Sequence, residues 1–179
     1  ARLHVFHIST AKELALFENI PLKEKNITSE VCIHHLNFSD EDYIKFGSKI
    51  KWNPSVKTKN DQNELWKALN TNLIDVIATD HAPHTLNEKS NNYLNCPSGG
   101  PLVQHSLNMM FEHYLNKKIT LEKIVQKMCH NPAILFRVNK RGFIRKNYFA
   151  DMVIINPRKN YTVDSNNILY KCCLLYTSD

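Results

Sequence analysis

The apolar residues of the first eighty positions fall into three short runs, and each run is followed by a segment with helical character. The runs read as buried strands over 3–8, 27–33 and 74–79, the last almost without a polar interruption. Helices are expected after Ser9-Thr10, after Ser39 with its acidic start, and over 61–70. Continuous apolar strands that alternate with helices are typical of a parallel sheet covered on both faces, so the pattern predicts an α/β fold.

The pattern changes after the third strand. A long polar stretch runs from Asp80 to Gly100, and loops of this length in compact domains are usually functional or mobile. Helices are expected over 101–116, 120–130 and 131–136, the last with Pro132 in its first turn. From Gly142 onward short strands are expected at 152–155 and 161–163, which indicates that a small β module begins there.

Composition narrows the class of protein. The 179 residues are 42% hydrophobic and carry a formal net charge of +6, with no apolar run approaching the length of a membrane helix. The lysines are scattered and lack interleaved aromatic residues, which disfavours nucleic acid as a partner but suits the attraction of a small anionic substrate. Five cysteines without C-x-x-C spacing argue against a disulfide framework and a cysteine zinc site, so a cytoplasmic protein with reduced thiols is expected.

Polar residues gather where each predicted strand ends. His7 follows the first strand, His34-His35 the second, and Asp80 the third. In parallel α/β folds the carboxyl ends of the strands form the active site, and imidazole and carboxylate are zinc ligands. Taken singly, each histidine could be a hydrogen-bonded structural residue, and Asp80 could cap a turn. On a strand His34 and His35 would face opposite sides, so at most one could reach a shared site.

The segment after the third predicted strand reads TDHAPH over 79–84, and it is accompanied by HIST at 7–10, HHL at 34–36 and WNP at 52–54. These motifs resemble those of dihydroorotases, in the cyclic amidohydrolase branch of the amidohydrolase superfamily. PSGGP at 97–101 and ADMVI at 150–154 follow in the family's order. The resemblance implies a TIM-like (β/α)8 metal-dependent hydrolase barrel, of which this chain would supply the last three strands and the start of the small β module.

The resemblance also implies roles for individual residues. His7 would bind one of two zinc ions, and Asp80 would bind the other and act as general base. Asn53 and His84 match positions that contact the substrate, and Ser98 and Gly99 would offer backbone groups to its ring. Asn53 could equally be a turn residue before a proline, and the glycine turn could provide loop flexibility alone. His34 and His35 are given no ligand role, only support of the ligands.

The implied reaction is the reversible interconversion of N-carbamoyl-L-aspartate and dihydroorotate, a step of pyrimidine biosynthesis. Zinc would lower the pKa of bound water to about 7, and Asp80 would carry the proton to the leaving nitrogen. The family's H-x-H, its bridging carboxylate or carbamylated lysine and its fifth-strand histidine have no counterpart here, and are expected upstream of Ala1. This piece alone is therefore expected to be inactive.

The resemblance also divides the chain. Residues 1–141 would belong to the barrel and 142–171 to the strands of the β module, while 172–179 are interpreted as a non-native tail. Two other functions stay open: a sister hydrolase of the allantoinase or hydantoinase type, and a non-catalytic dihydroorotase-like partner of aspartate transcarbamoylase. No membrane partner is expected, and a homodimer of the intact enzyme is left open.

Overall fold

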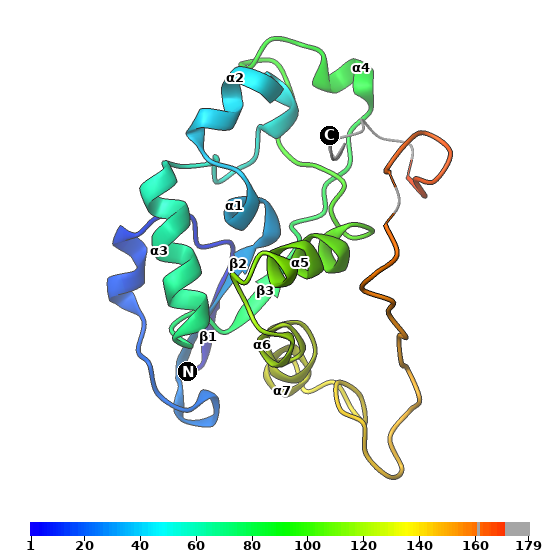
Figure 1. Cartoon of the computed structure of the whole chain (residues 1–179). Coiled ribbons are helices and arrows are strands. Elements are labelled where there is room, and N and C mark those ends of the chain that lie inside the picture. Colours follow the sequence, from blue (N-terminus) through cyan, green and yellow to red (C-terminus); the bar gives the residue numbers. More distant parts are fainter. Residues whose placement is uncertain (161, 171–179) are drawn as a thin grey trace.

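Three parallel strands form the centre of the chain. The computed structural model describes residues 1–160 and 162–170, and in it β1 (Leu3–Val5), β2 (Ile27–Cys32) and β3 (Val76–Ala78) pair in the order β1-β2-β3 (Figure 1). The register places Leu3 opposite Ile27, and Cys32 opposite Ala78. The predicted parallel α/β arrangement is confirmed. The strands are shorter than predicted, because β2 passes directly into a helix and β1 and β3 lead into left-handed backbone at His7 and Asp80.

Helices and 3-10 turns connect the strands and cover the sheet. The predicted helix over 61–70 is α3 (Lys59–Asn70), whose start is fixed by a capping box between Thr58 and Asp61. The helix expected after Ser9-Thr10 is only the 3-10 turn η1 (Lys12–Leu16), because Glu13 accepts hydrogen bonds from the backbone of both residues and closes the segment locally. The remaining elements before β3 are η2 (Leu22–Glu24), α1 (Ile33–Asn37), η3 (Asp40–Asp42), α2 (Tyr43–Phe46) and η4 (Gly47–Ile50).

The segment after β3 is mostly helical. It contains α4 (Leu86–Lys89), α5 (Ser106–Leu115), α6 (Leu121–Val125), the π-helical turn η5 (Gln126–His130) and α7 (Asn131–Leu135). The helix predicted over 101–116 therefore begins five residues later, and that over 120–130 changes to π geometry halfway. None of the helices in the described ranges is long and apolar enough to cross a membrane.

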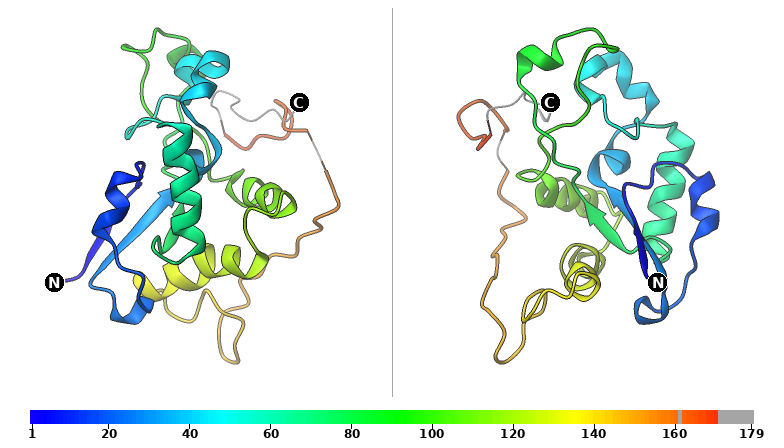
Figure 2. Two further views of the ribbon diagram at one scale, coloured as in Figure 1. Left: turned by 60° about the vertical axis from the view of Figure 1, so that its left-hand side comes forward. Right: turned by 180° about the vertical axis from the view of Figure 1, so that it is seen from behind.

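The hydrophobic core lies between the sheet and helices α1, α3, α5 and α6. Val31 and Ile77 contribute from the strands, and Leu69 and Met109 from the helices. The alternate residues of β1 and β2 are polar: His4 pairs with Thr28 at 2.9 Å and with Glu30 at 3.1 Å. Figure 2 shows α3 standing beside the sheet in both further views. One face of the sheet thus carries the core, and the other carries a polar cross-strand cluster.

Two buried lysines tie the strands together at their amino ends. The Lys25 ammonium donates to the Asp75 carboxylate at 2.8 Å, and this carboxylate also accepts the Ser29 N–H of β2 at 3.1 Å. The Lys127 ammonium donates to the Ile74 carbonyl at 2.6 Å. Because these bonds connect β2 with the start of β3, they fix the relative position of the two strands that lead to the candidate site.

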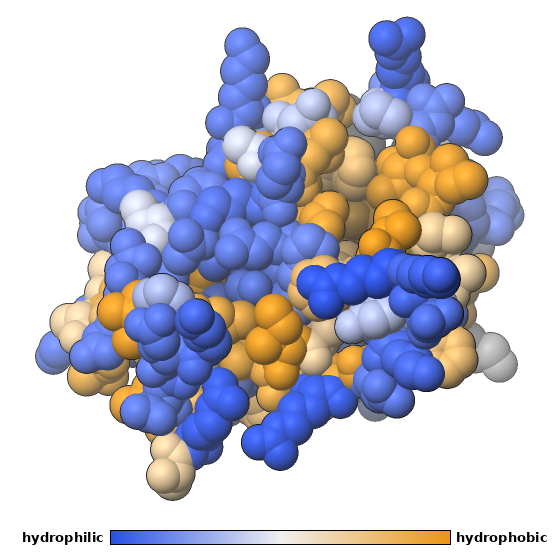
Figure 3. Space-filling view, turned by 90° about the horizontal axis from the view of Figure 1, so that it is seen from below, coloured by the Kyte–Doolittle hydropathy of each residue, from blue (hydrophilic) through white to orange (hydrophobic). Residues whose placement is uncertain are grey.

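The strands expected after Gly142 do not form in the described residues. Residues 152–155 adopt no regular secondary structure, nor do 162 and 163; residue 161 and the tail 171–179 lie outside the described residues. The segment runs away from the sheet (Figure 1), and a strand requires a partner that the described residues do not supply. Ile154 and Ile144 are almost fully exposed. Figure 3 shows apolar patches among the hydrophilic side chains on the face seen from below.

Candidate active site

The two residues predicted to carry the chemistry share an unusual backbone conformation. His7 lies two residues beyond the end of β1, with φ of 42°, and Asp80 lies two residues beyond β3, with φ of 46°. Few residues other than glycine adopt such angles, and Lys117, Arg137 and Lys140 do so in this structure as well, so the angle supports a site only together with the position at the strand ends. Both side chains are half-buried. The structure therefore places an imidazole and a carboxylate, each in left-handed backbone, at the same end of the parallel sheet.

Residues at the end of β2 connect these two positions. Cys32, the last residue of β2, carries a thiol whose pKa is raised by burial and by the charges of Glu30 and Asp80. The charge of His7 acts in turn on the imidazoles of His34 and His35. Since Asp80 influences one member of this group and His7 influences the others, the ends of all three strands meet around α1.

The structure corrects the prediction that His34 and His35 face opposite sides of a strand. Both lie in the first turn of α1, both are buried, and their ring centroids are 4.1 Å apart. The strand ends one residue earlier than Ile33, so helical geometry replaces the two-residue alternation of a strand. Both imidazoles therefore belong to the same interior cluster.

The environment of these two histidines keeps them neutral. Burial, with the charges of His35 and His7, holds the pKa of His34 well below its usual range, and the His34 ring stacks on Trp52 at 4.3 Å. Burial lowers the pKa of His35 to about 4, although its Nε2 lies 3.2 Å from the Pro54 carbonyl oxygen. Neutral imidazole is the form that accepts hydrogen bonds or binds a metal.

The predicted substrate-binding residues of the long loop are brought together. His84 Nε2 lies 3.0 Å from the Ser98 carbonyl oxygen, and the Ala82 N–H donates to the Gly100 carbonyl at 3.2 Å. Gly99 has a φ of 121°, and a Cβ built there would lie 2.6 Å from the carbonyl oxygen of Ala82. The two sides of the loop therefore approach so closely that only glycine fits at this position.

Asn53 lies in a neighbouring segment rather than in the loop itself. Its side chain is exposed, between Trp52, which stacks on His34, and Pro54, which contacts His35. The Gly99 N–H donates to the Lys51 carbonyl at 2.9 Å and so joins this segment to the glycine turn. The structure thus places Asn53 at the border between the histidine cluster and the loop.

Two lysines that the sequence does not single out hold the loop in place. The Lys89 ammonium is buried and donates to the carbonyls of Lys51, Pro97 and Gly99 at 3.2, 3.0 and 3.0 Å. The Lys51 ammonium donates to the carbonyls of Tyr93, Leu94 and Cys96 at distances of 2.6 to 3.3 Å. Nothing in the sequence distinguishes these two from surface lysines, because their acceptors are backbone oxygens brought together only by folding.

The donor types fit a metal ion. His7 and Asp80 offer imidazole nitrogen and carboxylate oxygen, which zinc accepts, from half-buried positions at the same end of the sheet, on the two strands that flank β2. The buried imidazoles of His34 and His35, whose pKa values are lowered by burial, add no positive charge there. His7 and Asp80 are therefore suited to contribute ligands, with the remaining ones supplied from elsewhere.

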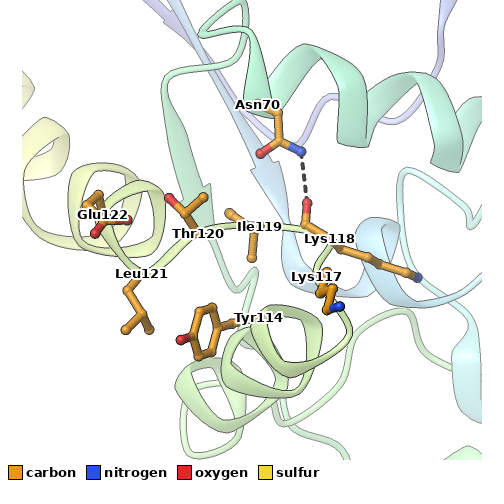
Figure 4. Close-up of a pocket in the computed structure, with 8 residues that line it drawn as sticks. All are labelled: Asn70, Tyr114, Lys117, Lys118, Ile119, Thr120, Leu121 and Glu122. Carbon is orange, nitrogen blue, oxygen red and sulfur yellow. Dashed lines mark hydrogen bonds between the residues drawn. The ribbon is translucent and has the colours of Figure 1, made fainter.

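A pocket at the opposite end of the sheet offers no such arrangement. It has a volume of about 400 Å³ and lies where the end of α3 meets the turn from α5 to α6 (Figure 4). Asn70 donates to the Lys118 carbonyl at 3.0 Å across it. Because α3 ends just before β3 begins, this pocket borders the amino ends of the strands, away from His7 and Asp80.

Comparison with known proteins gives the family. The model of the amidohydrolase family matches residues 3–172. A dihydroorotase of Carboxydothermus hydrogenoformans is 36% identical over 172 residues, which are 96% of this chain and 40% of that protein. A dihydroorotase of Methanosphaera stadtmanae is 35% identical over 171 residues, 95% of this chain and 39% of the relative. The chain thus spans about two fifths of the length of these relatives.

Solved structures agree with this relationship. An L-hydantoinase (dihydropyrimidinase) from Arthrobacter aurescens matches with a TM-score of 0.77 and 27% identity, over 84% of this chain and 34% of that one. A D-hydantoinase (dihydropyrimidinase) from Thermus sp. superposes with a TM-score of 0.82 over 93% of this chain and 38% of that one, and at 22% identity it supports the fold alone. The parallel strands, the strand-end residues and the family match agree, and the chain belongs to the amidohydrolase family.

Proposed function

We propose that the intact protein is a zinc-dependent dihydroorotase, which opens and closes the cyclic amide of dihydroorotate. The observation that carries the proposal is the TDHAPH segment, which places Asp80 in strained backbone at the end of β3, at the same end of the sheet as His7. The curated relatives named dihydroorotase match 90% or more of this chain, which supports the same substrate class. We place the reaction in cytoplasmic pyrimidine biosynthesis, in keeping with the free thiols of Cys32, Cys96 and Cys129.

Within this proposal, zinc held by His7 and Asp80 together with ligands from the rest of the protein would acidify a water and polarise the substrate carbonyl. The carboxylate of Asp80 takes the proton from the attacking water and passes it to the departing amide nitrogen. Its position directly after a buried strand limits its movement, which a group that transfers the same proton twice requires.

The loop residues bind and orient the substrate in the same proposal. His84 is held by the Ser98 carbonyl and faces the anionic end of the substrate. Asn53 contacts the ring, and the backbone at Ser98 and Gly99 approaches it closely because Gly99 carries no side chain. The intact barrel, the β module formed from 142–171 and the inactivity of residues 1–179 alone are parts of the same proposal.

The test is a comparison of substrates with the zinc-loaded intact protein. We expect hydrolysis of dihydroorotate and at least about a hundredfold lower kcat/KM for allantoin and hydantoin. Asp80→Asn should lower kcat by about a thousandfold or more, since it removes the proton carrier, whereas Asp164→Asn in the exposed C-terminal segment should leave kcat unchanged. Preferred turnover of hydantoin would favour a sister hydrolase, and a protein that binds zinc without turning over any of the three would favour a structural partner.

A further inference from the structure

A second group of metal-ligating side chains lies where β2 passes into α1. Cys32, His34 and His35 each offer one ligand atom, and these atoms all lie within 4.8 Å of one another. All three side chains are buried, with at most 2% exposure. The group comes from one short segment, because the end of β2 and the first turn of α1 direct the thiol and both imidazoles inward.

The polar atoms of this group lack the partners that buried polar atoms need. Nδ1 of His35 has no hydrogen-bond partner in the described part of the chain, and the ring nitrogens of His34 make no bond of standard length and angle there, although the Thr79 backbone acts on that ring. An unpaired polar group in a protein interior costs on the order of 1–3 kcal/mol, so most are satisfied. Such atoms beside a thiol therefore point to a metal ion that binds nitrogen and sulfur.

The surroundings of the two histidines prepare them for coordination. The His35 Nε2–H donates to the Pro54 carbonyl at 3.2 Å, which leaves the lone pair on Nδ1 of the neutral ring. A metal-binding histidine commonly has this arrangement, with its second nitrogen held by a backbone carbonyl. Trp52 stacks on His34 with an interplanar angle of 7° and fixes the plane of that ring.

We propose that Cys32, His34 and His35 bind one thiophilic divalent cation, for which Zn²⁺ is the best match. One sulfur and two nitrogen donors suit zinc and exclude magnesium and calcium, which require oxygen ligands. The thiol proton leaves to solvent when the metal–sulfur bond forms, so the bound group carries a single positive charge. The charge of Asp80 acts on Cys32 and would offset part of it. The absence of C-x-x-C spacing excludes only sites built from cysteine pairs, not this mixed one.

The proposal does not depend on the dihydroorotase activity, and its test uses metal binding alone. The intact protein, stripped of metal and carrying His7→Asn and Asp80→Asn, is titrated with Co²⁺ and then with Zn²⁺. We expect one Co²⁺ per chain to give a thiolate-to-cobalt charge-transfer band that Zn²⁺ displaces, and X-ray absorption to show a zinc–sulfur distance; Co²⁺ held by upstream histidines would lack this band. Failure of the catalytic proposal would leave this result unchanged.

Matched variants separate this site from other cysteines and histidines. Cys32→Ser should abolish the charge-transfer band and weaken Zn²⁺ binding more than tenfold, while Cys96→Ser should retain both, because the buried Cys96 thiol faces backbone carbonyls instead. His34→Asn should weaken binding, whereas His113→Asn should not. His113 is also buried, packs against Trp66, and has an Nε2 without a hydrogen-bond partner among the described residues. It therefore controls for the loss of a buried imidazole.

Three outcomes would overturn the proposal. The first is a folded protein that shows no charge-transfer band with Co²⁺, and the second is a band that survives Cys32→Ser. The third is Zn²⁺ binding that disappears entirely when only His7 and Asp80 are replaced. Circular dichroism of every variant establishes that it is folded, and the near-isosteric Cys32→Ser change provides the deciding result if His34→Asn does not fold.

Discussion

Replacing Lys89 tests most directly how the loop between Asp80 and Gly100 is held. The buried ammonium donates to three backbone carbonyls, two of them in the glycine turn and the third at Lys51. The Lys51 carbonyl also accepts the Gly99 N–H, so a single side chain connects both sides of the loop to the segment that carries Asn53. Lys89→Met keeps the length of the side chain and removes the charge and all three donors.

The cost of Lys89→Met follows from two opposing effects. Each hydrogen bond from a charged donor contributes about 1.5–3 kcal/mol, so the loss of three is large. Removing the ammonium also removes the cost of burying a charge, which is several kcal/mol. We therefore expect the free energy of unfolding to fall by about 2–4 kcal/mol, and the Gly99 amide to lose protection from hydrogen exchange.

Urea denaturation and hydrogen exchange of the folded protein measure both effects. Lys67→Met is the matched control, because Lys67 is exposed and Glu64 is its one ion-pair partner among the described residues, and it should change the stability by less than about 0.5 kcal/mol. Under the proposed function, Lys89→Met in the intact protein should raise KM for dihydroorotate more than it lowers kcat. It would loosen the loop that binds the substrate and leave Asp80, the proton carrier, in place. A Lys89→Met protein with unchanged stability and full protection of Gly99 would refute this account of the loop.

Three further changes probe the glycine turn, the Lys25–Asp75 ion pair at the amino ends of the strands, and a buried histidine. Gly99→Ala should cost about 2–4 kcal/mol in urea denaturation, because its Cβ would overlap Ala82, and a smaller loss would show that the turn can shift. Asp75→Asn should cost about 3–5 kcal/mol because the Lys25 ammonium stays buried, and adding Lys25→Met should recover part of it. Burial lowers the pKa of His113 to about 4, against an unfolded value near 6.5, so the native state binds fewer protons and stability should fall as pH drops from 6.5 to 4. His113→Gln should flatten this part of the stability–pH curve, and an unchanged slope would contradict the assignment.

The parts of the fold that depend on local signals were predictable from the sequence. Helix α3 begins at a capping box and presents a regular apolar face, so its existence and its start follow from neighbouring residues. The third strand is an apolar run, whereas polar residues interrupt the first two, and the parallel order of the three follows from the helical segments between them. The lengths of the strands were not predictable, because they depend on where left-handed residues and α1 interrupt the extended backbone.

The unpredicted features require contacts between distant residues. The strand expected at 152–155 had the right composition, but the described residues contain no strand beside it. Lys89 is separated from its acceptors by up to 38 residues, and no sequence pattern marks a lysine that binds carbonyls. The shared interior position of His34 and His35 was missed because β2 ends at Cys32. Both histidines therefore lie in α1, where adjacent side chains do not alternate between two faces as they do in a strand.

The prediction of His7 and Asp80 as site residues rests on a different signal, and the backbone adds to it. Polar residues directly after buried strands were selected because parallel sheets collect their chemistry at that edge. The positive φ of both residues adds an observation that the sequence could not supply, since a histidine and an aspartate in left-handed backbone each cost about 1 kcal/mol or more. Positive φ also occurs at Lys117, Arg137 and Lys140, so the angle alone does not mark a site. What distinguishes His7 and Asp80 is that each follows a parallel strand at the same end of the sheet, where an imidazole and a carboxylate can act together.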